Sequence, residues 1–135
     1  MITIIAVGGF DNLCSRHVRF LEKASKLGDL HVLLWSDDLV RRATGQPPKF
    51  PQAERRYLVE AIRYVKQALI STGWGWLDAE PEIARLRPDI YLVKEDGDRS
   101  EKRAFCAGHG LEYVGLRRIP KQGLPRRSST DLRGF

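Results

Sequence analysis

Near the start of the chain, the stretch Thr3-Ile4-Ile5-Ala6-Val7 is followed directly by Gly8-Gly9-Phe10-Asp11. Residues 3–7 are apolar or β-branched without polar alternation, which is typical of a strand buried on both faces in a parallel sheet. The paired glycines predict a turn, and residues 15–27 then have helical periodicity, with Gly28 as the stop. A buried strand that passes through a glycine turn into a helix indicates an α/β fold.

Strand-like and helix-like segments alternate along the rest of the chain. Further strands are predicted at 31–35, 67–70, 89–93 and 112–116, and further helices at 36–43, 52–65, 79–87 and 99–109. Residues 45–51 hold three prolines and should form a loop. This order predicts a Rossmann-like α/β fold, an open parallel five-stranded sheet with helices on both faces. The expected inward stripes are Val18, Leu21, Ala24 and Leu27 in the first helix, and Leu58, Ala61, Ile62 and Val65 in the helix at 52–65.

The composition fits a single domain over residues 1–135, either alone or within a longer protein. Apolar residues make up 42% and charged residues 30% of the chain, and no apolar run approaches the roughly 20 residues of a membrane span. Cys14 and Cys106 form no CxxC pair, so neither a disulfide framework nor a zinc site is expected. We therefore expect a cytoplasmic protein without a membrane partner and without a metal held by its own side chains.

The net charge of +6 is concentrated late in the chain. Residues 1–40 carry four Lys or Arg against five Asp or Glu, whereas residues 117–127 form a dense basic stretch. Such a stretch fits a solvated surface, a nucleic-acid patch or a site for a phosphate-bearing ligand. No aromatic residues are interleaved with the basic ones and no nucleic-acid-binding motif is present, so nucleic acid is not an expected partner.

In an open parallel sheet, ligands bind beyond the carboxyl ends of the strands. Three such ends carry polar or glycine-rich sequence: residues 8–17, residues 94–98, and the basic stretch that ends in Arg127-Ser128-Ser129-Thr130. The first combines two glycines, which let the backbone approach a ligand, with a helix start, where free N–H groups favour phosphate. A phosphate-bearing ligand is therefore expected near residues 8–17.

The stretch Gly8-Gly9-Phe10-Asp11-Asn12-Leu13-Cys14-Ser15-Arg16-His17 resembles the G-x-F-D-x-x-H-x-G-H signature of the cytidylyltransferase-like nucleotidyltransferases. Residues 20–29 look like that family's first helix, and residues 127–132 look like its terminal S-T-T motif. The resemblance implies transfer of a nucleotidyl group from CTP or ATP, usually with bound Mg²⁺, to a small phosphate- or phosphonate-bearing acceptor. Pyrophosphate would be the second product.

The resemblance also implies roles for individual residues. The positions that match the family's motifs supply hydrogen-bond donors, which suit in-line attack at phosphorus. Catalysis of such a reaction consists of positioning the reactants and of stabilising the charge that develops. The expected catalytic residues are His17, Arg16 and Arg127, and the expected acceptor-binding residues are Arg55 and Arg63. The expected nucleotide-binding residues are Gly8, Gly9, Phe10, Asp11, Cys14, His17, Lys94, Arg127, Ser128, Ser129 and Thr130.

Three positions depart from the family's pattern. Cys14 stands where the motif has its first histidine, Arg16 where it has glycine, and Thr44 where a lysine is usual. A thiol is a poor hydrogen-bond donor to phosphate, whereas the guanidinium of Arg16 suits phosphate oxygens. Lys49 can replace the missing lysine from the same loop. Either the enzyme works with rearranged cations, or the domain is catalytically degenerate and binds nucleotide as a sensor. We favour the working enzyme, with CTP before ATP, because residues 62–65 most resemble the alcohol-phosphate cytidylyltransferases.

Each of these residues also has a plain structural interpretation. His17 would otherwise be a packed or surface histidine, and Arg55 and Arg63 would pair with Glu60 on the surface. Ser128-Ser129-Thr130 would cap a short helix. Trp74-Gly75-Trp76 fits an acceptor pocket, a contact in a homodimer, or core packing.

Overall fold

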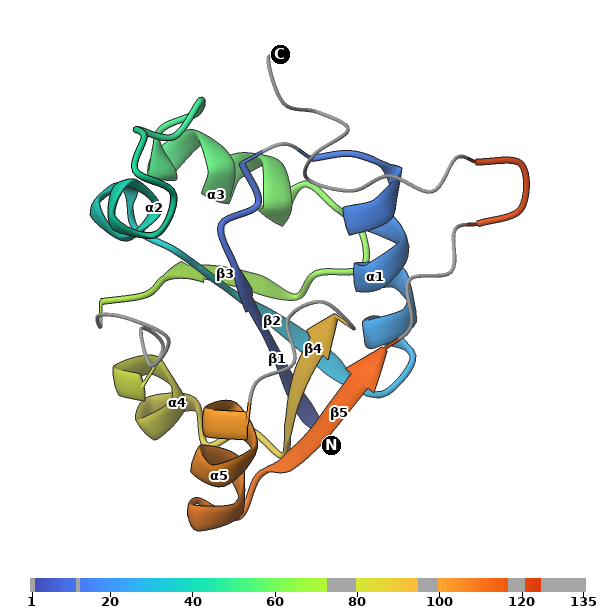
Figure 1. Cartoon of the computed structure of the whole chain (residues 1–135). Helices are drawn as coiled ribbons and strands as arrows, with labels where there is room; N and C mark the ends of the chain where they lie inside the picture. Colours follow the sequence, from blue (N-terminus) through green and yellow to red (C-terminus); the bar gives the residue numbers. More distant parts are fainter. Residues whose placement is uncertain (1, 12, 73–79, 95–99, 117–120, 125–135) are drawn as a thin grey trace.

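The computed structural model describes residues 2–11, 13–72, 80–94, 100–116 and 121–124, which form a sheet between two layers of helices (Figure 1). The strands are β1 (Thr3–Gly8), β2 (Asp29–Leu34), β3 (Gln67–Ile70), β4 (Ile90–Lys94) and β5 (Glu112–Leu116). The helices are α1 (Ser15–Ser25), α2 (Asp37–Thr44), α3 (Gln52–Glu60), α4 (Glu80–Leu86) and α5 (Ser100–Gly108). The predicted α/β class is confirmed.

The five strands form one parallel sheet in the order β3-β2-β1-β4-β5. β1 is the central strand, because Ile4 pairs with Leu30 of β2 on one side and with Ile90 of β4 on the other. The chain runs outward from β1 to β3 and then returns to the other side of β1. The carboxyl ends of β1 and β4 therefore flank a topological switch point, where ligands bind in such sheets.

Helices cover both faces of the sheet, as predicted (Figure 1). One face is covered by α1 and α3, with a core that includes Ile4, Ala6, Phe20, Leu21, Leu30, Val32, Val59 and Leu92. The other is covered by α4 and α5, with a core of Ile5, Leu33, Ile83, Tyr91, Val93, Cys106 and Leu111. Neighbouring residues of β1 thus enter different cores, which explains why its sequence is apolar without alternation.

Helix α3 differs from the prediction in both length and phase. It ends at Glu60 rather than at residue 65, and its buried residues are Arg55 and Val59. Leu58 and Ala61, expected inside, are exposed, whereas Ile62 and Val65 are partly buried against the core. The predicted inner stripe does not include Arg55, which is expected to bind the acceptor or, alternatively, to lie on the surface; the observed inner stripe includes its buried side chain.

Helix α1 ends at Ser25, earlier than the predicted residue 27, and Leu27 is therefore 39% exposed rather than buried. Its buried side chains are Arg16, His17, Phe20, Leu21 and Ala24. The inner face of α1 is thus polar where the helix starts and apolar beyond. No helix in the described ranges is long and apolar enough to cross a membrane.

Gly28 is required where β1 and β2 begin side by side. A Cβ at this position would overlap the carbonyl oxygen of Ile2, which accepts a hydrogen bond from the N–H of Asp29. Gly28→Ala should lower the free energy of unfolding by about 1–3 kcal/mol, because the backbone segments at Ile2 and Gly28 would have to move apart. Gly108→Ala is the control, since a Cβ there meets no atom within 4 Å. Denaturant melts measure both, and a Gly28→Ala protein as stable as wild type would contradict this packing.

Candidate functional site

The carboxyl end of β1 turns sharply through Gly8, Gly9 and Phe10. Phe10 has a φ of 51°, in the left-handed region that residues with a Cβ rarely adopt, and it is 6% exposed. A Cβ at Gly8 would lie 3.2 Å from the Phe10 ring, whose centroid lies 5.6 Å from that of His17. Unusual backbone of this kind persists where its surroundings hold it, and it is common at ligand-binding sites.

Helix α1 begins with a contact between Cys14 and His17. The backbone N–H of Cys14 donates to Nδ1 of His17 at 3.2 Å, and the Cys14 Sγ lies 3.5 Å from the same nitrogen. Because Nδ1 accepts this hydrogen bond, the neutral imidazole carries its proton on Nε2. His17 is 5% exposed, so it is a packed residue, and in this tautomer its Nε2 can donate a hydrogen bond.

Arg16 meets His17 in the first turn of α1, where Nη2 of Arg16 lies 3.1 Å from Nε2 of His17. Arg16 is 9% exposed, and its Nε has no hydrogen-bond partner in the part of the chain that the structure describes. Together with backbone N–H groups of the helix start, these side chains form a cluster of hydrogen-bond donors, in which Arg16 carries the positive charge. We call the side chains of Arg16 and His17, together with the backbone N–H groups of Ser15 and Arg16, the donor cluster; the backbone N–H of His17 itself donates to the Cys14 carbonyl at 3.0 Å. It lies directly after the Gly8-Gly9-Phe10 turn.

Arg55 is hydrogen-bonded within the protein through its guanidinium. Its side chain is 0% exposed, and its guanidinium donates to the backbone carbonyls of Phe50 (2.9 Å), Gly9 (2.8 Å) and Trp35 (2.8 Å). A further bond reaches the carboxylate of Asp37 at 2.8 Å. These bonds tie the ends of β1 and β2 to the loop before α3, so they do not support the expected contact between Arg55 and an acceptor.

Asp11 anchors the loop at residues 45–51. Its carboxylate oxygens accept hydrogen bonds from the backbone N–H groups of Lys49 (2.7 Å) and Phe50 (3.0 Å). The Thr44 hydroxyl donates to the Val40 carbonyl at 2.8 Å and so closes the end of α2. The Asp11 carboxylate, expected to contact the nucleotide, thus has hydrogen-bond partners within the protein. Lys49 is exposed on the loop at residues 45–51, which Asp11 holds.

Arg63 lies away from the donor cluster. It follows α3 and precedes the amino end of β3, and its guanidinium donates to the Tyr64 hydroxyl at 2.8 Å. This hydrogen bond raises the pKa of Arg63 above its ordinary value. The structure therefore does not bring Arg63 to the carboxyl edge of the sheet. The carboxylate of Glu60, the expected surface partner, instead contacts Arg56 at 3.6 Å.

The remaining predicted residues come from β4 and the basic stretch. Lys94 is the last residue of β4, on the carboxyl edge. Lys121, in the described part of the basic stretch, contacts Glu22 of α1 at 3.3 Å. Burial raises the pKa of Glu22, but hydrogen bonds from Arg19 and Lys121 lower it, and the net shift is downward. Arg127, Ser128, Ser129, Thr130 and Trp74-Gly75-Trp76 lie outside the described residues.

Glu82, which the sequence analysis does not single out, organises the carboxyl end of β3. It is 0% exposed and accepts hydrogen bonds from the N–H (3.0 Å) and hydroxyl (2.9 Å) of Thr72. Arg85 also donates to it, at 3.2 Å. The signal that could have found it is a carboxylate on the same helical stripe as Ile83 and Leu86, since charged residues are rarely buried without partners.

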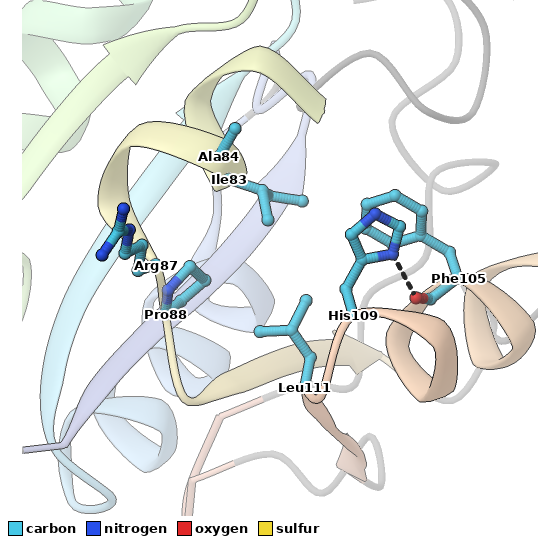
Figure 2. Close-up of a pocket in the computed structure, with 7 residues that line it drawn as sticks. All are labelled: Ile83, Ala84, Arg87, Pro88, Phe105, His109 and Leu111. Atoms are coloured by element: carbon cyan, nitrogen blue, oxygen red, sulfur yellow. Dashed lines mark hydrogen bonds between the residues drawn. The ribbon is translucent and has the colours of Figure 1, made fainter.

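A cavity of about 370 Å³ lies at the opposite end of the sheet (Figure 2). The His109 ring stacks on Phe105, with centroids 4.1 Å apart, and its Nδ1 donates to the Phe105 carbonyl oxygen at 2.9 Å. The cavity is lined by Ile83, Ala84, Arg87, Pro88, Phe105, His109 and Leu111. These residues precede β4 and β5, so the cavity is separate from the donor cluster.

The cytidylyltransferase-like family matches residues 5–134. The chain is 37% identical to the FAD synthase of Pyrococcus horikoshii over 99 residues, which cover 72% of this chain and 65% of that protein, slightly less than two thirds of its length. It is 30% identical to the FAD synthase of Picrophilus torridus over 132 residues, which cover 96% of this chain and 92% of that protein. The chain belongs to the cytidylyltransferase-like family of nucleotidyltransferases.

Solved structures agree with the fold. The lipopolysaccharide core biosynthesis protein from Thermoplasma volcanium GSS1 superposes with a TM-score of 0.74 at 25% identity, covering 90% of this chain and 99% of that one. A protein of unknown function from Archaeoglobus fulgidus superposes with a TM-score of 0.64 at 18% identity, covering 94% and 97%. The second likeness concerns the fold alone, and both support the Rossmann-like architecture.

Arg55→Met should lower the free energy of unfolding by about 3 kcal/mol, because it leaves a carboxylate and buried carbonyl groups without their donor. The matched control is Arg56→Met, the next position on α3. Its ion pair with Glu60 is exposed, with side-chain exposures of 43% and 42%, so its loss should cost less than about 1 kcal/mol. Denaturant melts compare the two variants, and equal losses would contradict the structural role of Arg55.

Proposed function

We propose that the chain is an adenylyltransferase that transfers the adenylyl group of ATP to the phosphate of FMN, forming FAD and releasing pyrophosphate. The relatives named FAD synthase support this substrate pair, since FAD consists of FMN and AMP joined through their phosphates. Those names give no support to the expected preference for CTP, so ATP replaces it in the proposal. FMN is in keeping with the expected small phosphate-bearing acceptor.

The observation that carries the proposal is the donor cluster beside the Gly8-Gly9-Phe10 turn, at the switch point of the sheet. A helix start combines free N–H groups with a partial positive charge, and the preceding glycines let phosphate approach the backbone. Arg16 and His17 add side-chain donors at the same place. This combination suits a polyphosphate far better than a neutral ligand.

In the proposed reaction, an oxygen of the FMN phosphate attacks the α-phosphorus of ATP in line. A new P–O bond forms while the bond from the α-phosphorus to the α–β bridging oxygen breaks, and pyrophosphate leaves with that electron pair. Negative charge grows on the equatorial oxygens and on the leaving group. Fixed donors lower this barrier without a covalent intermediate.

The protein groups divide this work in the proposal. Nε2–H of His17 and the N–H groups at the start of α1 stabilise the growing charge, and Lys94 contacts the base or ribose. Arg127, Ser129 and Thr130, outside the described residues, hold the β- and γ-phosphates. Asp11 and Arg55 act indirectly, because they fix the loop and strand ends around the site.

The proposal includes Mg²⁺ carried by the triphosphate. When bound, the ion neutralises phosphate charge, and it prefers oxygen ligands, which phosphates and water supply. Within the described ranges, no group of three or more His, Cys, Asp or Glu side chains is placed to hold a metal. The donor cluster consists of N–H groups and does not fit a cation, so its residues act on phosphate oxygens.

Purified protein should convert FMN and ATP to FAD in the presence of Mg²⁺, with much less product from CTP, as measured by chromatography with flavin fluorescence. His17→Ala should lower kcat/KM by about 10²–10³-fold, the usual effect of losing one transition-state donor. His109→Ala removes an imidazole at the opposite end of the sheet and should leave activity unchanged. A protein that binds ATP but forms no product would instead be a degenerate nucleotide-binding or sensor domain.

Combining Ser129→Ala with Thr130→Ala should weaken ATP binding by about a hundredfold or more, since two hydrogen bonds to a charged phosphate would be lost, each worth about 1.5–3 kcal/mol. The melting temperature of the protein should stay close to that of wild type. Calorimetric titration with ATP and Mg²⁺ measures the affinity, and duplex DNA at physiological salt should bind more weakly than ATP. An unchanged ATP affinity would leave Ser128-Ser129-Thr130 with the role of a helix cap.

A further inference from the structure

We infer that Arg16 is a phosphate-binding residue, which holds an oxygen of the triphosphate together with His17. The inference rests on the proposed function and adds to it a donor that the family's signature lacks. Arg16 stands where that signature has glycine, and Cys14 stands where it has its first histidine. A hydrogen-bond donor to phosphate is therefore missing at position 14 and present at position 16, within the same turn.

The Arg16 guanidinium has hydrogen-bonding capacity that the described residues do not fill. Arg16 is 9% exposed, and its buried Nε has no partner among the described residues. Buried polar atoms nearly always have a partner, and charged donors are the most costly to leave without one. Nε and Nη2 lie along the edge of the guanidinium that binds two oxygens side by side. This edge faces His17, because Nη2 lies 3.1 Å from its Nε2.

The contact between Arg16 and His17 brings two donors together. Nδ1 of His17 accepts from the N–H of Cys14, so the neutral imidazole carries its proton on Nε2. The nitrogens of a guanidinium only donate. An anionic phosphate oxygen placed beside two N–H groups can accept hydrogen bonds from both at once. The pair is therefore complementary to an anion.

The place of Arg16 in α1 gives an independent argument. The start of a helix carries a partial positive charge, which favours acidic residues and disfavours basic ones. The first turn of α1 contains no acidic residue, although it contains both Arg16 and His17. Positive charge gathered at a helix start is unfavourable to folding and favourable to binding phosphate.

Thermal melts with sodium tripolyphosphate test the anion site without any substrate chemistry. Arg16→Gln should melt no lower than wild type in plain buffer, because it removes the repulsion between the Arg16 charge and the start of α1. It should lose most of the increase in melting temperature that tripolyphosphate gives to wild type. Arg16→Lys should keep part of that rise. Arg19→Gln, one turn further along α1 and paired with Glu22 at 3.1 Å, is the matched control and should keep all of it. A full rise in Arg16→Gln would overturn the inference.

Formation of FAD gives a second readout. Arg16→Gly should lower kcat/KM by about 10²–10³-fold, and adding Cys14→His should restore part of the loss, because an imidazole donor returns to the turn. A merely structural role for Arg16 would give no such rescue. Arg19→Gln should again match wild type.

The two proposals fail separately. A wild type that forms no FAD, but whose tripolyphosphate binding depends on Arg16, would overturn the proposed function and leave the anion site standing. A wild type that forms FAD, with full activity in Arg16→Gly, would overturn the role of Arg16 and leave the proposed function standing.

Discussion

The guanidinium of Arg55 is 0% exposed, and a charge buried this deeply must find its acceptors within the protein. It finds them on four separate segments: the turn after β1, the end of β2, the start of α2, and the loop before α3. None of these segments can shift alone without leaving a donor or an acceptor unpaired. The carboxyl edge of the sheet is therefore held as one unit from its centre.

The donor cluster depends on this unit. Gly9, whose carbonyl Arg55 holds, immediately precedes Phe10 with its left-handed backbone, and the Phe10 ring packs beside His17. Asp11 extends the same support to the 45–51 loop. Donors that are fixed before a reaction begins stabilise developing charge without reorganisation, which is the main electrostatic advantage of an enzyme over water. In the proposed reaction, the rigid support that Arg55 and Asp11 give to the turn and the loop would therefore contribute to catalysis.

The sequence predicts the strands well, because each is a short apolar run between helical segments, and 67–70 and 112–116 agree with β3 and β5 to the residue. It also predicts that the glycine turn and His17 meet at a helix start. It does not predict the intramolecular hydrogen bonds of Arg55, Asp11 and Glu82, because their partners lie on other segments. A charged residue looks like surface until tertiary contacts supply its acceptors, and for that reason the phase of α3 is wrong.

The central place of β1 also bears on the order in which the chain folds. β1, β2, β3 and every described partner of Arg55 lie within residues 3–70, whereas β4 pairs with β1 from residues 90–92. Pairings between distant segments close long loops, and the N-terminal part leaves the ribosome first. A three-stranded half with its buried arginine can thus assemble during synthesis while one edge of β1 stays open. The arrival of β4 closes that aggregation-prone edge and, in the same event, brings Lys94 to the switch point.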